Sequence, residues 1–233
     1  TVVPNVCAAV LFDLKFGSMA ARPDVAMGYA ACEAALQGNP IQEGNVGAGT
    51  GCTIGKIRGP QYAMKGGLGT CAYRQGDLMV GAVMACNAMG DVVEDGTILA
   101  GARNDDNTGF AGTEGWLIQH SQRQRDIFSG KLVGENTVIG CVVTNAALNK
   151  AQAAKLAAVA QNGIARAVRP ANATFDGDSL FAMCHGTVPA DPDAVGILAA
   201  RAVEEAIRRG IRAAETLHGR PAWRDLPFVS QST

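Results

Sequence analysis

The chemistry that this chain could perform centres on a threonine that follows a polar stretch. Thr137 begins the apolar run TVIGCVVT, directly after Gly134, Glu135 and Asn136. If the chain were cut between Asn136 and Thr137, the threonine would carry both a hydroxyl and a free α-amine. An α-amine titrates at about pH 8, so it can act as the base for its own hydroxyl. A threonine that merely starts a strand is the alternative interpretation of this junction.

Two carboxylates lie close together in the sequence FDGDS. Asp176 and Asp178 flank Gly177, and a tight turn would bring both carboxylates to one site. Like charges at short range raise a carboxyl pKa, so the pair could hold and relay a shared proton. A solvated turn or a cation site is the alternative interpretation of this short motif.

A lysine and an asparagine complete the set of candidate residues. Lys56 follows the glycine-rich stretch 44–59, whose backbone is open to close approach. A phosphate-binding P-loop is excluded, because its pattern requires glycine where Thr50 stands and serine or threonine where Ile57 stands. The Lys56 ammonium could lower the pKa of the α-amine, and the Asn87 amide could donate to an oxyanion. A surface lysine and a turn-forming asparagine are the alternatives.

Composition limits the class of protein. The 233 residues are 48% hydrophobic and 18% charged with a net charge of −1, which fits one globular domain over residues 1–233. The absence of a basic excess argues against nucleic-acid and membrane-surface partners. No apolar run is long enough for a membrane span, and no basic-then-apolar leader is visible in the given sequence, although an upstream segment could carry one. Seven cysteines without a C-x-x-C motif predict buried, reduced thiols and a cytoplasmic location, and three scattered histidines argue against zinc.

The apolar periodicity predicts an α/β chain that would position these side chains. Strands are expected over 2–14, 61–73, 77–87, 137–144 and 179–188, with a hairpin over 91–100 that turns at 94–96. Helices are expected over 23–36, over 150–168 after an Asn149 cap, and over 192–216 after an Asp191 cap. The polar stretch of about 101–136 is expected to be a long loop or mobile linker.

Three segments together resemble one known family. ENTVIGCVVTNAALNKAQAAKLA, FDGDSLFAM and EGNVGAGTGCTIGK are similar to segments of the L-aminopeptidase/D-esterase family, which includes β-peptidyl aminopeptidases and nylon-oligomer hydrolases. The resemblance runs from Val2 to about Leu226. It implies a four-layer α/β/β/α sandwich of an N-terminal nucleophile amide hydrolase. Such a chain would cleave itself at Asn136–Thr137 into α and β chains, here 1–136 and 137–233.

The resemblance also implies roles for single residues. Thr137 would be the nucleophile, and the Asp176 and Asp178 carboxylates would lie near it with Lys56 and Asn87, as in the nylon-oligomer hydrolases. In the substrate pocket, Phe12 stands where those hydrolases have a tyrosine. Any role of that hydroxyl is therefore absent, which argues against a nylon-type substrate preference more than against amidase chemistry. The family further implies a peptide or amide-oligomer substrate, no cofactor, and a homo-oligomer, often a tetramer of αβ units.

The first residue of the chain is also a threonine, which raises a second possible nucleophile. However, TVVPNVCAAVLFDL matches an interior strand of the family, so we expect the chain to lack the N-terminal third of the family and Thr1 to have no such role. Two alternatives to an amide hydrolase stay open. One is an acyl transferase of the ornithine acetyltransferase type, which shares the fold and the self-cleavage. The other is a non-catalytic member that has lost processing.

Overall fold

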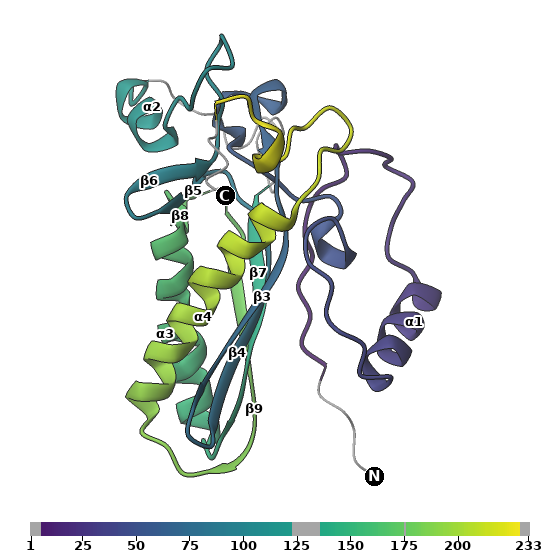
Figure 1. Cartoon of the computed structure of the whole chain (residues 1–233), viewed down its shortest axis with the longest axis vertical. Coiled ribbons are helices and arrows are strands. Elements are labelled where there is room, and N and C mark those ends of the chain that lie inside the picture. The colour runs from purple at the N-terminus through teal and green to yellow at the C-terminus, as the bar shows by residue number, and fades with distance from the viewer. Residues whose placement is uncertain (1–5, 123–135, 175, 229–233) are drawn as a thin grey trace.

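The computed structural model describes residues 6–122, 136–174 and 176–228 (Figure 1). Its four helices are α1 (Val25–Leu36), α2 (Thr113–Gln119), α3 (Lys150–Ala167) and α4 (Pro192–Ala213). Its strands are β1 (Thr53–Ile54), β2 (Met64–Lys65), β3 (Gly67–Gln75), β4 (Leu78–Asn87), β5 (Asp91–Glu94), β6 (Thr97–Ala100), β7 (Thr137–Ala146), β8 (Val168–Arg169) and β9 (Ser179–Val188).

The largest sheet of the described chain has the strand order β3-β4-β7-β9. Strands β3, β4 and β7 are antiparallel neighbours, whereas β9 runs parallel to β7 after the crossover through α3. A smaller sheet has the order β6-β5-β8, and β1 pairs with β2 as a short ribbon. The register aligns the end of β4 with the start of β7, because Asn87 lies opposite Thr137.

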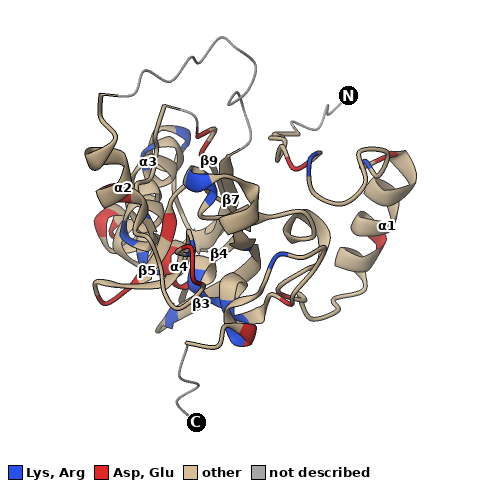
Figure 2. Cartoon of the chain, turned by 90° about the horizontal axis from the view of Figure 1, so that it is seen from above, with Lys and Arg blue, Asp and Glu red and all other residues tan. Residues whose placement is uncertain are grey.

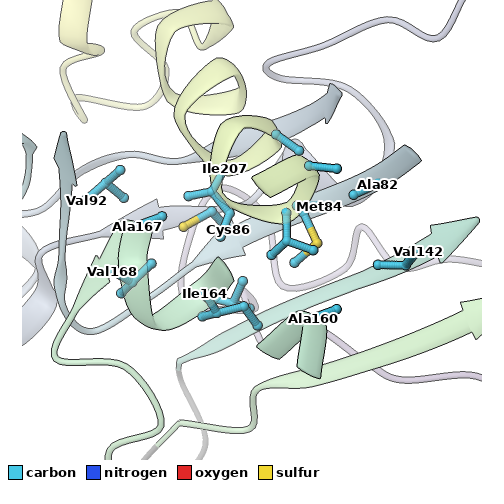
Figure 3. Close-up of a cluster of buried hydrophobic side chains, with 14 of the residues drawn as sticks. Ala82, Met84, Cys86, Val92, Val142, Ala160, Ile164, Ala167, Val168 and Ile207 are labelled. Carbon is cyan, nitrogen blue, oxygen red and sulfur yellow. The ribbon is translucent and has the colours of Figure 1, made fainter. Parts of the chain in front are cut away.

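Helices α3 and α4 pack together on one face of the large sheet and form the core with it (Figure 1). Figure 3 shows Met84 and Val142 of the sheet facing Ile164 of α3 and Ile207 of α4. Glycines allow α4 to approach β3 closely, since a Cβ added at Gly69 would collide with the Ala206 carbonyl oxygen. Close approach therefore brings apolar side chains of both layers into one core.

The opposite face of the large sheet is only partly covered by the described residues. Met79 is 51% exposed, Val143 is 42% exposed and Met183 is 60% exposed. The register places Met183 directly beside Val143 on this face. The two faces therefore differ, because helices α3 and α4 pack on one of them while apolar side chains reach solvent on the other.

The expected elements that surround the candidate site are confirmed. Helix α3 follows an Asn149 capping box, and α4 follows the Asp191 cap but ends at Ala213 rather than at 216. Strands β4 and β9 match their expected ranges closely, and β7 extends two residues beyond the expected 144. The predicted hairpin over 91–100 forms as β5 and β6. The α/β fold class of the sequence-based expectation is therefore confirmed.

Other expectations about elements are wrong or need correction. The strand expected over 2–14 is wrong where it is described, because residues 6–13 pair with no strand and Val6 and Val10 are 81% and 84% exposed. The helix expected from residue 23 starts at Val25, because the Asp24 side chain caps it through the Met27 N–H. The expected linker of 101–136 contains α2, while its part at 123–135 lies outside the described residues.

The remaining surface expectations have mixed outcomes. All seven cysteines are free, but the expectation that all are buried is wrong, because Cys7 and Cys32 are exposed. Basic and acidic residues are interspersed over the chain (Figure 2), which agrees with a net charge of −1. Within the described residues, no helix is long and apolar enough to cross a membrane. The same part of the chain holds no cluster of metal-ligating side chains.

Candidate active site

Three neighbouring elements bring the candidate residues together at one end of the large sheet. Thr137 starts β7, opposite Asn87 at the end of β4. The turn before β9 carries Asp176 and Asp178, and Asp176 pairs with Asn136 in a parallel bridge. Thr137 is 6% exposed and Asn136 is 7% exposed, so the junction is buried. The predicted nucleophile and the predicted carboxylates therefore lie in one site.

The carbonyl group of Asn136 accepts two hydrogen bonds at this junction. The Thr137 hydroxyl donates to the Asn136 carbonyl oxygen at 2.5 Å. The Gly177 N–H donates to the same oxygen at 2.9 Å. A hydroxyl thus lies against the peptide bond that precedes its own residue, and a backbone N–H also polarises the carbonyl group of that bond. Such an N–H donor is the kind of group that stabilises an oxyanion.

Asp178 ties its turn to the start of β7. One carboxylate oxygen accepts the Val138 N–H at 2.8 Å, and the other accepts the Asn172 N–H at 3.1 Å. Burial raises the pKa of Asp178 above its ordinary value, although both N–H donors act against this shift. Both oxygens of Asp178 are therefore used to hold the backbone of the site in place.

Asp176 differs from Asp178 because one of its carboxylate oxygens accepts no hydrogen bond in the described part of the chain. Its Oδ2 accepts the Ala173 N–H at 2.9 Å, whereas its buried Oδ1 has no hydrogen-bond partner in the described part of the chain. Burial, together with the charge of Asp178, raises the pKa of Asp176 to about 6. The neighbouring Asn136 Oδ1 is also a buried acceptor without a donor in that part of the chain. Asp176 can therefore exchange a proton near neutral pH.

Lys56 and Asn87 form the second half of the site. The Lys56 ammonium donates to the Asn87 side-chain oxygen at 2.8 Å and to its carbonyl oxygen at 2.9 Å. The Thr53 N–H donates to the same side-chain oxygen at 3.0 Å. These donors fix the orientation of the Asn87 amide, whose Nδ2 donates to the Phe12 carbonyl oxygen at 3.2 Å. The side-chain amide of Asn87, a residue that lies opposite Thr137 in the sheet, is thus held in a fixed orientation.

Lys56 also forms part of the wall of a pocket. Phe12, the residue predicted to line a substrate pocket, lies in its wall, and the Phe12 side chain is 37% exposed. The pocket is lined by Phe12, Asp13, Lys15, Phe16, Thr53, Lys56, Pro60, Ala63 and Arg220. Apolar rings and charged groups of both signs thus border the lysine that contacts Asn87.

Sequence reasoning named the polar side chains of the site but missed the groups that hold them. The Gly177 and Thr53 N–H groups are backbone donors, which leave no signature in residue type. Lys65 was also missed, although it is fully buried and donates to three carbonyl oxygens of the surrounding backbone. A lone lysine within the small-residue sequence AMKGGLG was the available signal.

Comparison with known sequences identifies one family and several relatives. The sequence profile of peptidase family S58 matches residues 1–223. An uncharacterized aminopeptidase of Mycobacterium leprae is 35% identical, over 95% of this chain and 65% of that protein. An uncharacterized aminopeptidase of Mycobacterium tuberculosis H37Rv is 32% identical, over 97% of this chain and 68% of that protein. A 6-aminohexanoate-oligomer endohydrolase of Paenarthrobacter ureafaciens is 29% identical, over 76% and 49%.

Comparison with solved structures supports the α/β sandwich. An L-aminopeptidase D-Ala-esterase/amidase from Ochrobactrum anthropi, described as a variant of the Ntn hydrolase fold, matches with a TM-score of 0.53 and 25% identity. The match covers 82% of this chain and 51% of that one. A β-aminopeptidase from Burkholderia sp. matches with a TM-score of 0.54 and 24% identity, over 79% and 50%. The chain therefore spans about half the length of these two proteins.

Proposed function

This chain belongs to peptidase family S58, and we propose that it hydrolyses amide or peptide bonds with Thr137 as its nucleophile. One observation carries the proposal: the Asn136 carbonyl oxygen accepts the Thr137 hydroxyl at 2.5 Å and the Gly177 N–H at 2.9 Å. This contact places the attacking hydroxyl and an oxyanion donor at one carbonyl group, and both are needed for an intramolecular acyl shift.

The first reaction would be self-cleavage at Asn136–Thr137. The Thr137 oxygen attacks the Asn136 carbonyl carbon, and the Gly177 N–H stabilises the negative charge that develops on the carbonyl oxygen. The C–N bond then breaks, the nitrogen takes up a proton and an ester links Asn136 to the Thr137 oxygen. Water hydrolyses this ester, which releases the Asn136 carboxylate, the hydroxyl and the new α-amine. The nearby Asp176, with a pKa of about 6, is suited to accept and return the proton.

The second reaction would be hydrolysis of a substrate amide. The freed α-amine removes the proton of the Thr137 hydroxyl as the oxygen attacks the substrate carbonyl. The Asn87 oxygen accepts from Lys56 and Thr53, and one Nδ2 hydrogen donates to the Phe12 carbonyl oxygen, so the second Nδ2 hydrogen would donate to the oxyanion. The amine product leaves with a proton, and water then releases the acid from the Thr137 ester. The proposed mechanism uses protein groups and water, with no cofactor.

We further propose small peptides or amide oligomers as substrates. Relatives named as aminopeptidases and as 6-aminohexanoate-oligomer endohydrolases support this class. The pocket beside Lys56 would hold part of the substrate, with the Phe12 ring as an apolar wall in place of a tyrosine hydroxyl. A single domain cut into chains 1–136 and 137–233, a cytoplasmic location, and assembly of these αβ units into a homo-oligomer such as a tetramer complete the proposal.

The experiment that tests the function combines a gel with a substrate panel. Wild type should separate into fragments 1–136 and 137–233 on a denaturing gel and should hydrolyse α-peptide amides, β-peptides or 6-aminohexanoate oligomers. Thr137→Ala should stay at full length and be inactive. Acyl transfer to an amine in preference to water would instead favour the acyl transferase. A wild type that neither cleaves nor hydrolyses any member of the panel would contradict the proposal.

A further inference from the structure

A second lysine, distinct from the one in the proposed site, lies wholly inside the fold. Lys65 of β2 is 0% exposed, and its ammonium donates to the carbonyl oxygens of Gly49 at 2.8 Å, Cys52 at 2.8 Å and Gly66 at 2.9 Å. Its nitrogen also lies 5.5 Å from the centre of the Phe16 ring. Burying an ammonium without such acceptors would cost much free energy, so these three carbonyl groups are needed to stabilise the charge.

Two of these bonds reach the glycine-rich stretch 44–59 that leads to Lys56. Lys65 is paired with Thr53 across the β1–β2 ribbon. Within the stretch, the Cys52 carbonyl oxygen accepts both the Lys65 ammonium at 2.8 Å and the Gly66 N–H at 2.8 Å. The stretch is therefore fastened to β2 at its Cys52–Thr53 peptide.

The same peptide contacts the proposed oxyanion donor from its other end. The Thr53 N–H donates to the Asn87 side-chain oxygen at 3.0 Å. A cation on the carbonyl end of a peptide polarises it and strengthens the hydrogen bond that its N–H end donates. A continuous chain of hydrogen bonds thus runs from the Lys65 ammonium through the Cys52–Thr53 peptide to Asn87, which lies opposite Thr137 in the sheet.

We propose that Lys65 is a positioning residue that fixes the Asn87 amide beside Thr137 through the Cys52–Thr53 peptide. The kinetic consequence rests on the proposed function, whereas the structural consequence does not. Lys56 donates directly to the Asn87 side-chain oxygen, and Lys65 acts on the same oxygen through the Thr53 N–H. Together they fix the orientation of the Asn87 amide group. Lys65 contacts neither Asn87 nor Thr137 directly, and it affects them only through the Cys52–Thr53 peptide.

The protonation of Lys65 gives the proposal a measurable signature. The titratable groups that face it are Cys52 in the glycine-rich stretch and Asp13 in the N-terminal segment. Burial lowers the pKa of Lys65 to about 8 and raises the pKa of Cys52 to about 12, so Cys52 stays a neutral thiol in this range. As the pH rises through about 8, Lys65 loses its positive charge, and its hydrogen bond to the Cys52 carbonyl oxygen should weaken.

The kinetic test compares Lys65→Met with Met64→Ala, its equally buried neighbour on β2. Lys65→Met should lower kcat about tenfold or more through misplacement of Asn87, with KM changed less than about twofold. Met64→Ala removes core volume and should lower the unfolding midpoint in urea while kcat stays near the wild-type value. If wild type is active and the two variants lose kcat equally, Lys65 is a structural residue and the proposal is wrong.

The second test needs no activity and no change at Lys65. In Thr137→Ala protein, which cannot expose an α-amine at this position, the side-chain amide signals of Asn87 are followed by NMR from pH 6 to pH 10. The proposal predicts a shift of these signals with a midpoint near the Lys65 pKa of about 8. Signals of Asn87 that do not move over this range would overturn the proposal, whether or not the proposed hydrolase activity exists.

Discussion

Two aspartates separated by a single glycine have different environments in this site. Asp178 uses both oxygens to accept backbone N–H groups, whereas Asp176 keeps one buried oxygen without a partner in the described chain. The motif DGD predicted a carboxylate pair but not this division, because the division depends on how the turn presents each side chain. The pKa of Asp176, raised to about 6, follows from that burial and from the neighbouring charge.

The raised pKa predicts that Asp176→Asn stabilises the fold at pH 7. The folded-state value of about 6 exceeds the ordinary value of 3.8, so charged Asp176 opposes folding and stability falls as the pH rises between these values. Asparagine removes the charge, and we expect a gain of about 1–2 kcal/mol, less than full burial would give because the group is partly screened. Urea unfolding in a Thr137→Ala background measures this gain, which should vanish below about pH 4.

The same substitution should abolish self-cleavage if Asp176 moves the proton. Asp176→Asn in an otherwise wild-type chain is expected to stay at full length on a denaturing gel. If Asp176→Asn is more stable than its parent but is not cleaved, Asp176 acts in the cleavage chemistry and is not needed for folding. If Asp176→Asn is less stable than its parent at pH 7, the charged carboxylate stabilises the folded state, and the prediction is wrong.

Gly177 offers a test of the space around the nucleophile. A Cβ at this position would lie 3.3 Å from the Thr137 hydroxyl oxygen and would keep the backbone N–H. Gly177→Ala should therefore slow self-cleavage by about tenfold or more, because the hydroxyl must shift from its attacking position. The time course of fragment formation measures the rate. Gly115→Ala, at an open position in α2, is the control, and equal rates for both variants would contradict this prediction.

At the scale of elements, the sequence predicted helices that begin at a local cap, but it did not predict elements that depend on contacts with distant residues. Asn149 and Asp191 cap α3 and α4 as expected, because a cap is a contact within four residues. Helix α2 was missed because its first residue is held from a distance: Asp91 accepts the Thr113 N–H at 2.6 Å and the Thr113 hydroxyl at 2.7 Å. The predicted N-terminal strand was wrong because apolar residues such as Val10 pair with no strand in the described part of the chain.

The packing of α4 on β3 depends on the absence of side chains at specific glycines. A Cβ at Gly69 would collide with the Ala206 carbonyl oxygen and with Gly210. Gly69→Ala should therefore destabilise the chain by about 3 kcal/mol or more, because two backbones cannot move apart without opening the core. Urea unfolding measures the loss, and Gly115→Ala should change the stability by less than about 1 kcal/mol. A Gly69→Ala protein as stable as wild type would contradict this account of the helix–sheet contact.

At the scale of the whole molecule, the site joins parts of the sequence that are far apart. The glycine-rich stretch, the end of β4, the start of β7 and the turn before β9 each contribute one or two groups. The sequence alone indicated these segments through their resemblance to one family, and the register of β4 against β7 explains why they meet. What the sequence could not predict is the backbone that joins them, including the path from Lys65 to Asn87.

The most direct test of the central claim is the mass and N-terminal residue of the fragments formed by purified wild type. The account predicts two fragments, with a new N-terminus at Thr137, and predicts that Thr137→Ser retains the cut while Thr137→Ala loses it. The serine keeps the attacking hydroxyl, and the alanine removes it without adding bulk. An intact wild-type chain, or a cut at any other bond, would contradict the assignment of Thr137 as the nucleophile.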